Sequence, residues 1–256
     1  MPWIARVRFR LPLADAIKYP RWHSHIAHLS LMLALAFPLD AQGMKGDTAA
    51  ITLARRLIER MGGAEQWSKA NWIYARERAS YAQFDSTADA EFWRRTDAPA
   101  QWVRVRSAQI DRLGAWTATS GWDYRDGQLT VKDRAAMQSV LGWWPGEIYV
   151  MYVRLARNDP KLRLVASPPR SFTVLDDDTG ENLGEFHVSA SGELVRWVRR
   201  HGTNAVDYIY GPLKQFGPIR VPDWGALTSG AFRFYYTDFR LSERAPADIS
   251  FTPPNR

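Results

Sequence analysis

The chain has no cysteine and only five histidines among its 256 residues. Without cysteine it can form no disulfide bond and offers no thiol for lipidation of a mature amino terminus. Its main apolar run, Leu29–Leu39, is shorter than the roughly 20 residues that a membrane-spanning helix requires. The Gly-x-Ser-x-Gly, Gly-x-Gly-x-x-Gly and P-loop motifs are also absent, so the usual signatures of nucleophilic hydrolases and nucleotide-binding proteins are missing.

Three of the histidines, His23, His25 and His28, lie together just before that apolar run. Three imidazoles are one ligand short of a closed structural zinc site, and no cysteine supplies the fourth. The same segment has a basic start, an apolar centre and a small residue after it, which is the layout of a secretory leader. We therefore predict a cleaved signal peptide over residues 1–41, with a retained metal-binding arm or a short membrane-anchoring segment as the alternatives.

Removal of this segment leaves a mildly basic chain, residues 42–256. Five of the 34 Lys and Arg residues and two of the 27 Asp and Glu residues lie before residue 42, so the net charge falls from +7 to +4. Nucleic-acid-binding domains carry a denser basic stripe, so no nucleic-acid partner is expected. No linker or repeat divides the remaining residues. We predict one soluble, monomeric periplasmic domain that has no lipid anchor, metal or cofactor.

An amphipathic helix opens this domain. Asp47 is placed to cap its first turn, and apolar residues recur at helical spacing from Ile51 to Met61. Gly62 and Gly63 then end the helix, because glycine readily takes the left-handed conformation found there.

Most of the remaining sequence predicts short antiparallel strands separated by Asp, Gly, Pro and Ser. Side chains alternate in character along Trp72–Phe84, and Asp126-Gly127 suits a tight hairpin turn. A second helix is expected over Pro145–Asn158. The predicted fold is mainly β, in the α+β class. A large curved antiparallel sheet forms an incomplete barrel, and the amino-terminal and inserted helices cover its concave side.

Several motifs follow one another in this layout. The first helix ends in Gly-Gly-Ala-Glu-x-Trp at Gly62–Trp67, and a Gly-Trp-x-Tyr-x-x-Gly hairpin at Gly121–Gly127 precedes the helical insertion. The closing hairpins include FHVSASGELVRWVRR, and a final FYYTDFRLSE strand leads into a Phe-Thr-Pro-Pro tail. In this arrangement residues 42–256 resemble the periplasmic lipoprotein-carrier superfamily, with its LolA/LolB-like fold.

The resemblance implies an apolar cavity that shelters acyl chains. The expected function is a non-enzymatic carrier that binds a lipid, a lipoprotein acyl chain or another hydrophobic ligand. Its expected partners are a lipid or acylated protein and an inner- or outer-membrane protein. Fold alone does not determine function, and two alternatives stay open. One is an interaction module of an envelope complex with a filled cavity. The other is a cofactor-free enzyme acting on a small hydrophobic substrate, for which Glu77 or Asp238 could supply a general acid or base.

Aromatic and arginine side chains supply the candidate site residues. Trp and Tyr combine a large apolar area with one donor, which suits a cavity for acyl chains with a polar head group. The predicted ligand-binding residues are Trp72, Tyr74, Trp122, Trp143, Trp144, Tyr149 and Tyr152, of which the adjacent Trp143 and Trp144 are placed to form a lid. Arginine binds phosphate in a forked geometry, so contacts to a head group or an acidic partner are expected from Arg104, Arg106, Arg199 and Arg200. The alternative for these arginines is a solvated outer sheet face.

Overall fold

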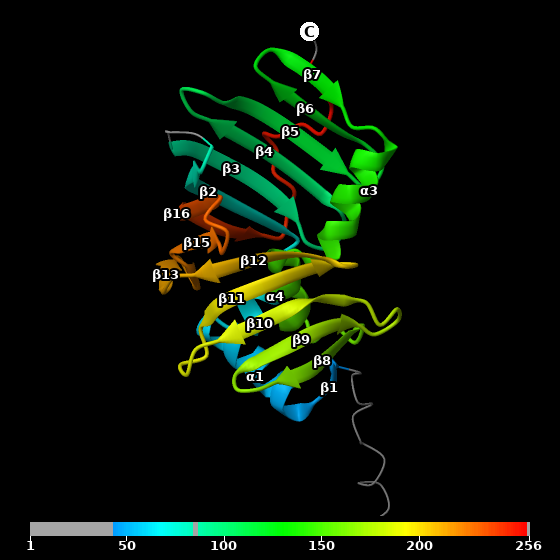
Figure 1. Cartoon of the computed structure of the whole chain (residues 1–256), viewed down its shortest axis with the longest axis vertical. Coiled ribbons are helices and arrows are strands. Elements are labelled where there is room, and N and C mark those ends of the chain that lie inside the picture. The colour runs from blue at the N-terminus through cyan, green and yellow to red at the C-terminus, as the bar shows by residue number, and fades with distance from the viewer. Residues whose placement is uncertain (1–42, 84–86, 255–256) are drawn as a thin grey trace, which may run out of the picture. The chain divides into compact units, whose positions relative to one another are not determined.

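Strands dominate the described part of the chain, residues 43–83 and 87–254, in this computed structural model (Figure 1). The strands are β1 (Lys45–Gly46), β2 (Trp72–Tyr81), β3 (Thr87–Arg95), β4 (Ala100–Arg106), β5 (Asp111–Thr117), β6 (Gly121–Arg125), β7 (Gln128–Val131), β8 (Leu162–Ser167), β9 (Ser171–Asp176), β10 (Asn182–Val188), β11 (Leu194–His201), β12 (Asn204–Tyr210), β13 (Leu213–Phe216), β14 (Ile219–Pro222), β15 (Trp224–Leu227) and β16 (Phe232–Ser242). The helices are α1 (Thr48–Arg60), α2 (Ala64–Ser68), α3 (Arg134–Trp143), the 3-10 helix η1 (Trp144–Gly146) and α4 (Ile148–Ala156). The predicted signal peptide and its histidines lie outside the described residues.

Fourteen strands form one sheet in the order β1-β8-β9-β10-β11-β12-β15-β16-β2-β3-β4-β5-β6-β7, and β13 and β14 form a separate hairpin. Strand β1 pairs with β8 in parallel, and the other neighbours in this sheet are antiparallel. The last strand, β16, lies beside the early strand β2 along the length of both (Figure 1). Strands from the beginning and the end of the described chain are thus neighbours in the middle of the sheet.

The sheet curves so that distant strands face one another. Arg94 on β3 and Arg199 on β11 both bind the carboxylate of Glu147. Five strand spacings separate β3 from β11 in the sheet order, which would be roughly 24 Å in a flat sheet at about 4.8 Å per strand. The edge strands β1 and β7 do not pair with each other in the described part of the chain. The predicted incomplete antiparallel barrel is therefore confirmed.

Helices α1 and α4 pack on the inner face of this curved sheet, which we define as the face that carries Ile73, Ala75, Glu77, Ala79 and Tyr81 of β2. Seven of the nine residues of α4 are buried, as expected for a helix that is apolar on all sides. Helix α1 instead buries one stripe that includes Ala54 and Leu57. Both helices join one core cluster with inner-face residues such as Phe186 and Phe239. The prediction that these two helices cover the sheet is confirmed.

The ends of α1 differ in how well the sequence predicts them. Gly62 and Gly63 end the helix with φ angles of 109° and 88°, as predicted. Asp47 does precede the helix, but its side chain makes no hydrogen bond to the first turn. Its carboxylate accepts a hydrogen bond from the backbone N–H of Ala166 at 2.8 Å. The predicted cap is wrong because strand β8 offers a competing backbone donor.

The helical insertion is larger than the predicted single helix over Pro145–Asn158. Helix α3 begins after Asp133, whose side chain accepts a hydrogen bond from the backbone N–H of Ala136 at 2.8 Å. Pro145 lies in η1, and α4 begins only at Ile148. A short helix, α2, follows Gly63. None of the helices in the described residues has the length and apolar composition needed to cross a membrane.

Candidate functional site

Two adjoining clefts open on the inner face between strands β2–β5, strands β11–β12 and the helical insertion. Their volumes are about 250 and 370 Å³. Both clefts are lined by Arg94, Gln101, Val103, Arg112, Glu147, Arg199 and Tyr208. We name the two clefts together the inner groove. Its position, between sheet and helices, is typical of ligand sites in open barrels.

Small side chains leave the space that the groove occupies. Side chains two apart in a strand share a face, so Ala79, Ala88 and Ala90 point to the same side as Glu77. These alanines are short, and Gly114 on β5 has no side chain at all. A Cβ atom at Gly114 would lie 2.4 Å from Oδ1 of Asp123, so a side chain there would displace the carboxylate that binds Arg112 and Lys132. Of these residues, Ala90 and Gly114 line the clefts, so larger side chains at these two positions would fill them.

A cluster of three charged residues forms the centre of the groove. Glu147 precedes α4 and binds Arg94 of β3 through one oxygen and Arg199 of β11, at 2.9 Å, through the other. The three side chains are only 14%, 13% and 20% exposed for Arg94, Glu147 and Arg199 respectively. Arg94 also stacks on Tyr149, and Arg199 stacks on Trp143 and donates to its backbone carbonyl at 3.1 Å from Nε. This cluster therefore fixes the helical insertion against both walls of the sheet.

A second charged group lines the larger cleft of the groove. Asp123 on β6 binds Arg112 at 2.7 Å and also binds Lys132. Burial alone would raise the pKa of Asp123, but hydrogen bonds from Lys132 and Arg112 outweigh it, so the pKa is lowered. The groove thus carries four cations against the carboxyl groups of Glu77, Asp123 and Glu147. This excess of positive charge favours an anionic ligand.

Glu77 differs from the other carboxyl groups because it is buried without a cation bound to it. It lines the smaller cleft and is 8% exposed. Burial raises its pKa to about 7, with Arg94 lowering the value and Glu147 raising it. Protonation of Glu77 is thus poised to change near neutral pH.

Replacement of Glu77 by glutamine is expected to stabilise the protein at pH 8. The pKa of Glu77 in the folded state, about 7, lies above the ordinary value of 4.5, so the folded state holds the proton more tightly than the unfolded chain. The resulting stability is fully present below pH 4.5 and is lost as the pH rises through 7. The loss amounts to at most about 3 kcal/mol. Urea unfolding at pH 5 and pH 8 tests this, and an equal pH dependence in wild type and Glu77→Gln would contradict it.

Some of the predicted site residues line the groove. Trp143 and Trp144 lie at the junction of α3 and η1 and line the larger cleft, and Arg199 lies between them and Glu147. Tyr149 and Tyr152 project from α4 into the core. The hydroxyl of Tyr149 bonds to that of Tyr236, and the hydroxyl of Tyr152 has no partner among the described residues.

The other predicted aromatic residues lie on the outer face, because neighbouring residues of a strand point to opposite sides. Trp72 packs against Phe251 of the carboxy-terminal tail, with ring centroids 5.9 Å apart. Trp122 donates from Nε1 to the backbone carbonyl of Phe251 at 2.8 Å. Tyr74 packs against Trp93 at 5.1 Å. These three predicted ligand contacts do not line the inner groove.

Three of the predicted arginine contacts also alternate with inner-face residues and lie outside the groove. Arg104 and Arg106 flank Val105 on β4, and Arg200 follows Arg199 on β11. Arg104 lines a separate outer-face pocket of about 680 Å³ that also contacts Pro254 of the tail. Of the four arginines, the structure brings only Arg199 to the groove.

Sequence reasoning missed Glu147, which no motif marks. The available signal was a single carboxylate between a Trp-Trp-Pro-Gly turn and the apolar helix α4. No motif marks Arg94 either, because its inward direction follows only from the register of β2 and β3. Among residues 43–83 and 87–254, no group of three or more His, Cys, Asp or Glu side chains is arranged to hold a metal ion.

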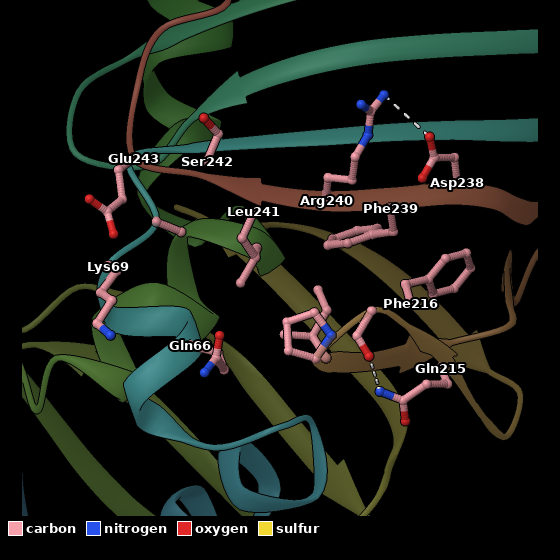
Figure 2. A pocket seen from close by; sticks show the side chains of 14 residues that line it. Gln66, Lys69, Gln215, Phe216, Asp238, Phe239, Arg240, Leu241, Ser242 and Glu243 are labelled. Carbon is pink, nitrogen blue, oxygen red and sulfur yellow. Dashed lines mark hydrogen bonds and ion pairs between the residues drawn. The ribbon is translucent and has the colours of Figure 1, made fainter.

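A third pocket, of about 580 Å³, lies between α2, the β13–β14 hairpin and the end of β16 (Figure 2). Phe239 and Leu241 point toward this pocket, while Asp238 and Arg240 point away and pair with each other at 3.2 Å. The amide of Gln215 is bonded to the carbonyl of Gly217. The pocket lacks a buried charged cluster, so the inner groove is the stronger candidate site.

No family model matches the chain, and no curated protein matches its sequence. A LolA superfamily protein from Nitrosomonas europaea is 10% identical, with 80% of this chain and 97% of that chain covered and a TM-score of 0.47. A putative outer-membrane lipoprotein-sorting protein domain from Vibrio parahaemolyticus is 9% identical, with 78% and 94% covered and a TM-score of 0.34. The chain is similar to these proteins. Both TM-scores are below 0.5, so the fold and the site are established from the strand order and the contacts of this chain.

Proposed function

We propose that the protein is a non-enzymatic periplasmic carrier or binding protein that holds an amphiphilic ligand, an acyl chain with an acidic head group, in the inner groove. The observation that carries this proposal is the cluster of Arg94, Glu147 and Arg199 inside a cleft with apolar walls. A lipid or an acylated protein supplies such a ligand. An inner- or outer-membrane protein then delivers or receives it.

The walls of the groove are suited to an acyl chain. Aromatic and aliphatic side chains line it, namely Phe92, Val103, Ile148 and Phe234 in the smaller cleft and Trp116, Val140, Trp143 and Trp144 in the larger one. Burial of apolar area drives binding of a chain there, at about 25 cal/mol per Å². The surplus of cations supplies charge complementarity to an acidic head group.

The size of the groove limits the ligand. Helices α1 and α4 fill the inner face over β8–β10 with a continuous core, which includes Leu164, Phe172 and Phe186. The space that remains is the pair of clefts of about 250 and 370 Å³. We therefore expect one acyl chain of modest length to bind, and not a lipid with several long chains.

Replacing both Trp143 and Trp144 by alanine is expected to weaken binding of a fatty-acid probe by more than about 1 kcal/mol, because buried aromatic side chains commonly dominate such contacts. Isothermal titration with dodecanoate measures the change. The matched control replaces Trp93 and Trp102, an adjacent pair on the outer face, and should leave the affinity unchanged. Equal loss in the two double variants, or no loss in either, would remove the groove as the binding site.

The interaction module remains the second candidate, on one observation. Strand β15 pairs with β16 only over Arg233–Tyr235, so Asp238–Ser242 have a ladder partner on the β2 side alone among the described residues. This open edge borders the third pocket, and a strand edge can accept an extended segment of another protein. The two functions separate in one experiment, since an interaction module should bind neither dodecanoate nor dodecan-1-ol.

A further inference from the structure

Two mostly buried side chains with polar groups, Glu77 and Trp197, line the smaller cleft of the inner groove. Glu77 is 8% exposed, and its carboxyl group forms no hydrogen bond or ion pair with any residue in the described ranges. Trp197 is 1% exposed, and its Nε1 likewise has no partner there. Buried polar groups in folded proteins are almost always hydrogen-bonded, so the orphaned indole N–H of Trp197 requires an explanation.

The chemistry of these groups identifies what would satisfy them. The indole N–H of Trp197 can only donate, a protonated carboxyl group at Glu77 can donate, and the guanidinium of Arg94 lines the same cleft. Three residues with donor groups line this one cleft, and such a set fits an oxyanion. Phe92, Ile148 and Phe234 line the same, mostly polar cleft, so it offers apolar contacts to an acyl chain beside the donors that would bind an oxyanion.

We propose that Glu77 and Trp197 form the head-group subsite of the inner groove, and that Glu77 makes capture of a carboxylate-headed amphiphile depend on its own proton. With the proton on Glu77, the acid donates a hydrogen bond to the ligand. Without it, two carboxylates meet in a buried cleft and repel each other, and the ligand is released. This inference rests on the proposed carrier function.

Glu77 is the group in this cleft whose charge changes near neutral pH, because burial raises its pKa to about 7. The arginines stay protonated, and burial raises the pKa of the surrounding tyrosines. The charged and titratable groups that face Glu77 from the packed elements are Tyr81, Arg94, Arg112, Glu147, Tyr149, Arg199, Tyr208, Tyr210 and Tyr236. A histidine, His201, lies nearby against Trp143, with ring centroids 5.6 Å apart, and must be tested separately.

The test measures the dissociation constant of dodecanoate for the full protein between pH 6.5 and 8.5, by titration calorimetry. If only the protonated form of Glu77 binds, the affinity should fall about 25-fold over this range, in proportion to the protonated fraction. Glu77→Gln, which stays neutral, should lose this dependence. His201→Gln should retain it. Dodecan-1-ol, which has the same chain and no charge, should bind wild type equally at both ends of the range, and acetate should not bind.

The outcomes separate the subsite from the carrier function. A flat dodecanoate affinity in wild type, or a pH dependence that persists in Glu77→Gln, would overturn the subsite while binding itself remains. Loss of the pH dependence in His201→Gln would assign it to His201 and overturn the subsite as well. If neither dodecanoate nor dodecan-1-ol binds wild type at any pH, the carrier function fails and the subsite fails with it. Urea unfolding of both variants establishes that each is folded under the conditions used.

Discussion

Replacing Trp67 by alanine is expected to lower the free energy of unfolding by about 4 kcal/mol, as large truncations in a core do. Trp67 is fully buried in α2, and its Nε1 donates to the backbone carbonyl of Met61 at 3.0 Å. Its ring meets Tyr152 of α4 edge-on at 5.1 Å and packs against Phe239 of β16 at 6.1 Å. The substitution therefore opens a cavity between two helices and the sheet and removes one of the two hydrogen bonds that the Met61 carbonyl accepts, the other coming from the backbone N–H of Arg220 at 3.0 Å. Urea unfolding followed by circular dichroism measures the change.

Two controls bracket this prediction. Trp67→Phe keeps much of the ring volume and loses the hydrogen bond, so it should cost about 1–2 kcal/mol. Val131→Ala, at a residue that is 67% exposed on the edge strand β7, should cost less than about 0.5 kcal/mol. If Trp67→Ala costs no more than Val131→Ala, then the Gly-Gly-Ala-Glu-x-Trp motif does not anchor α1 and α2 to the barrel.

Replacing Glu147 by glutamine is expected to lower the free energy of unfolding by about 4 kcal/mol, because removal of one partner leaves buried charges without compensation. Here the loss affects two cations at once, Arg94 and Arg199, which bind opposite oxygens of the carboxylate. Both arginines are mostly buried, so water replaces the lost contact poorly. The change also removes the ion pairs between the helical insertion and strands β3 and β11, while the hydrogen bond from Arg199 to the Trp143 carbonyl remains. Urea unfolding at pH 7 measures the loss.

An exposed ion pair provides the matched control for Glu147. Asp207 binds Arg196 at 2.7 Å across β11 and β12, but the arginine side chain is 44% exposed. Asp207→Asn should cost less than about 1 kcal/mol, as exposed pairs usually do. Replacing Arg94, Glu147 and Arg199 together by apolar residues should recover much of the loss, because no charge is then left unpaired. A loss for Glu147→Gln equal to that for Asp207→Asn would show that the cluster does not hold the groove together.

The sequence predicts the local elements well where one physical cause dominates. Alternation along Trp72–Phe84 identifies β2, since one face of this strand packs on the core. The turn between β6 and β7 has Asp126 at φ 50° and Gly127 at φ 82°, the positive angles that an Asp-Gly hairpin allows. The apolar pattern of Ile148–Ala156 likewise predicts α4.

Elements and site residues that depend on distant contacts were not predicted. Helix α3 was missed although the sequence carries its local signals, a cap at Asp133 and apolar residues at helical spacing at Met137, Val140 and Leu141. The groove joins residues more than 100 positions apart in sequence, such as Arg94 and Arg199, and only the curvature of the sheet brings them together. The face toward which a side chain points alternates along a strand, so Trp72 and Ile73, which are adjacent in sequence, lie on opposite sides of the sheet. Which of these two sides faces the groove follows only from the packing of the whole sheet.

Native mass spectrometry of the protein, expressed with its own amino-terminal segment and purified gently, tests the carrier function most directly. The spectrum should show a bound acidic molecule with an acyl chain, identified by lipid extraction, and the variant with alanine at Trp143 and Trp144 should lack it. A wild-type spectrum that shows the bare chain, even after incubation with dodecanoate, would contradict binding of an amphiphile in the inner groove.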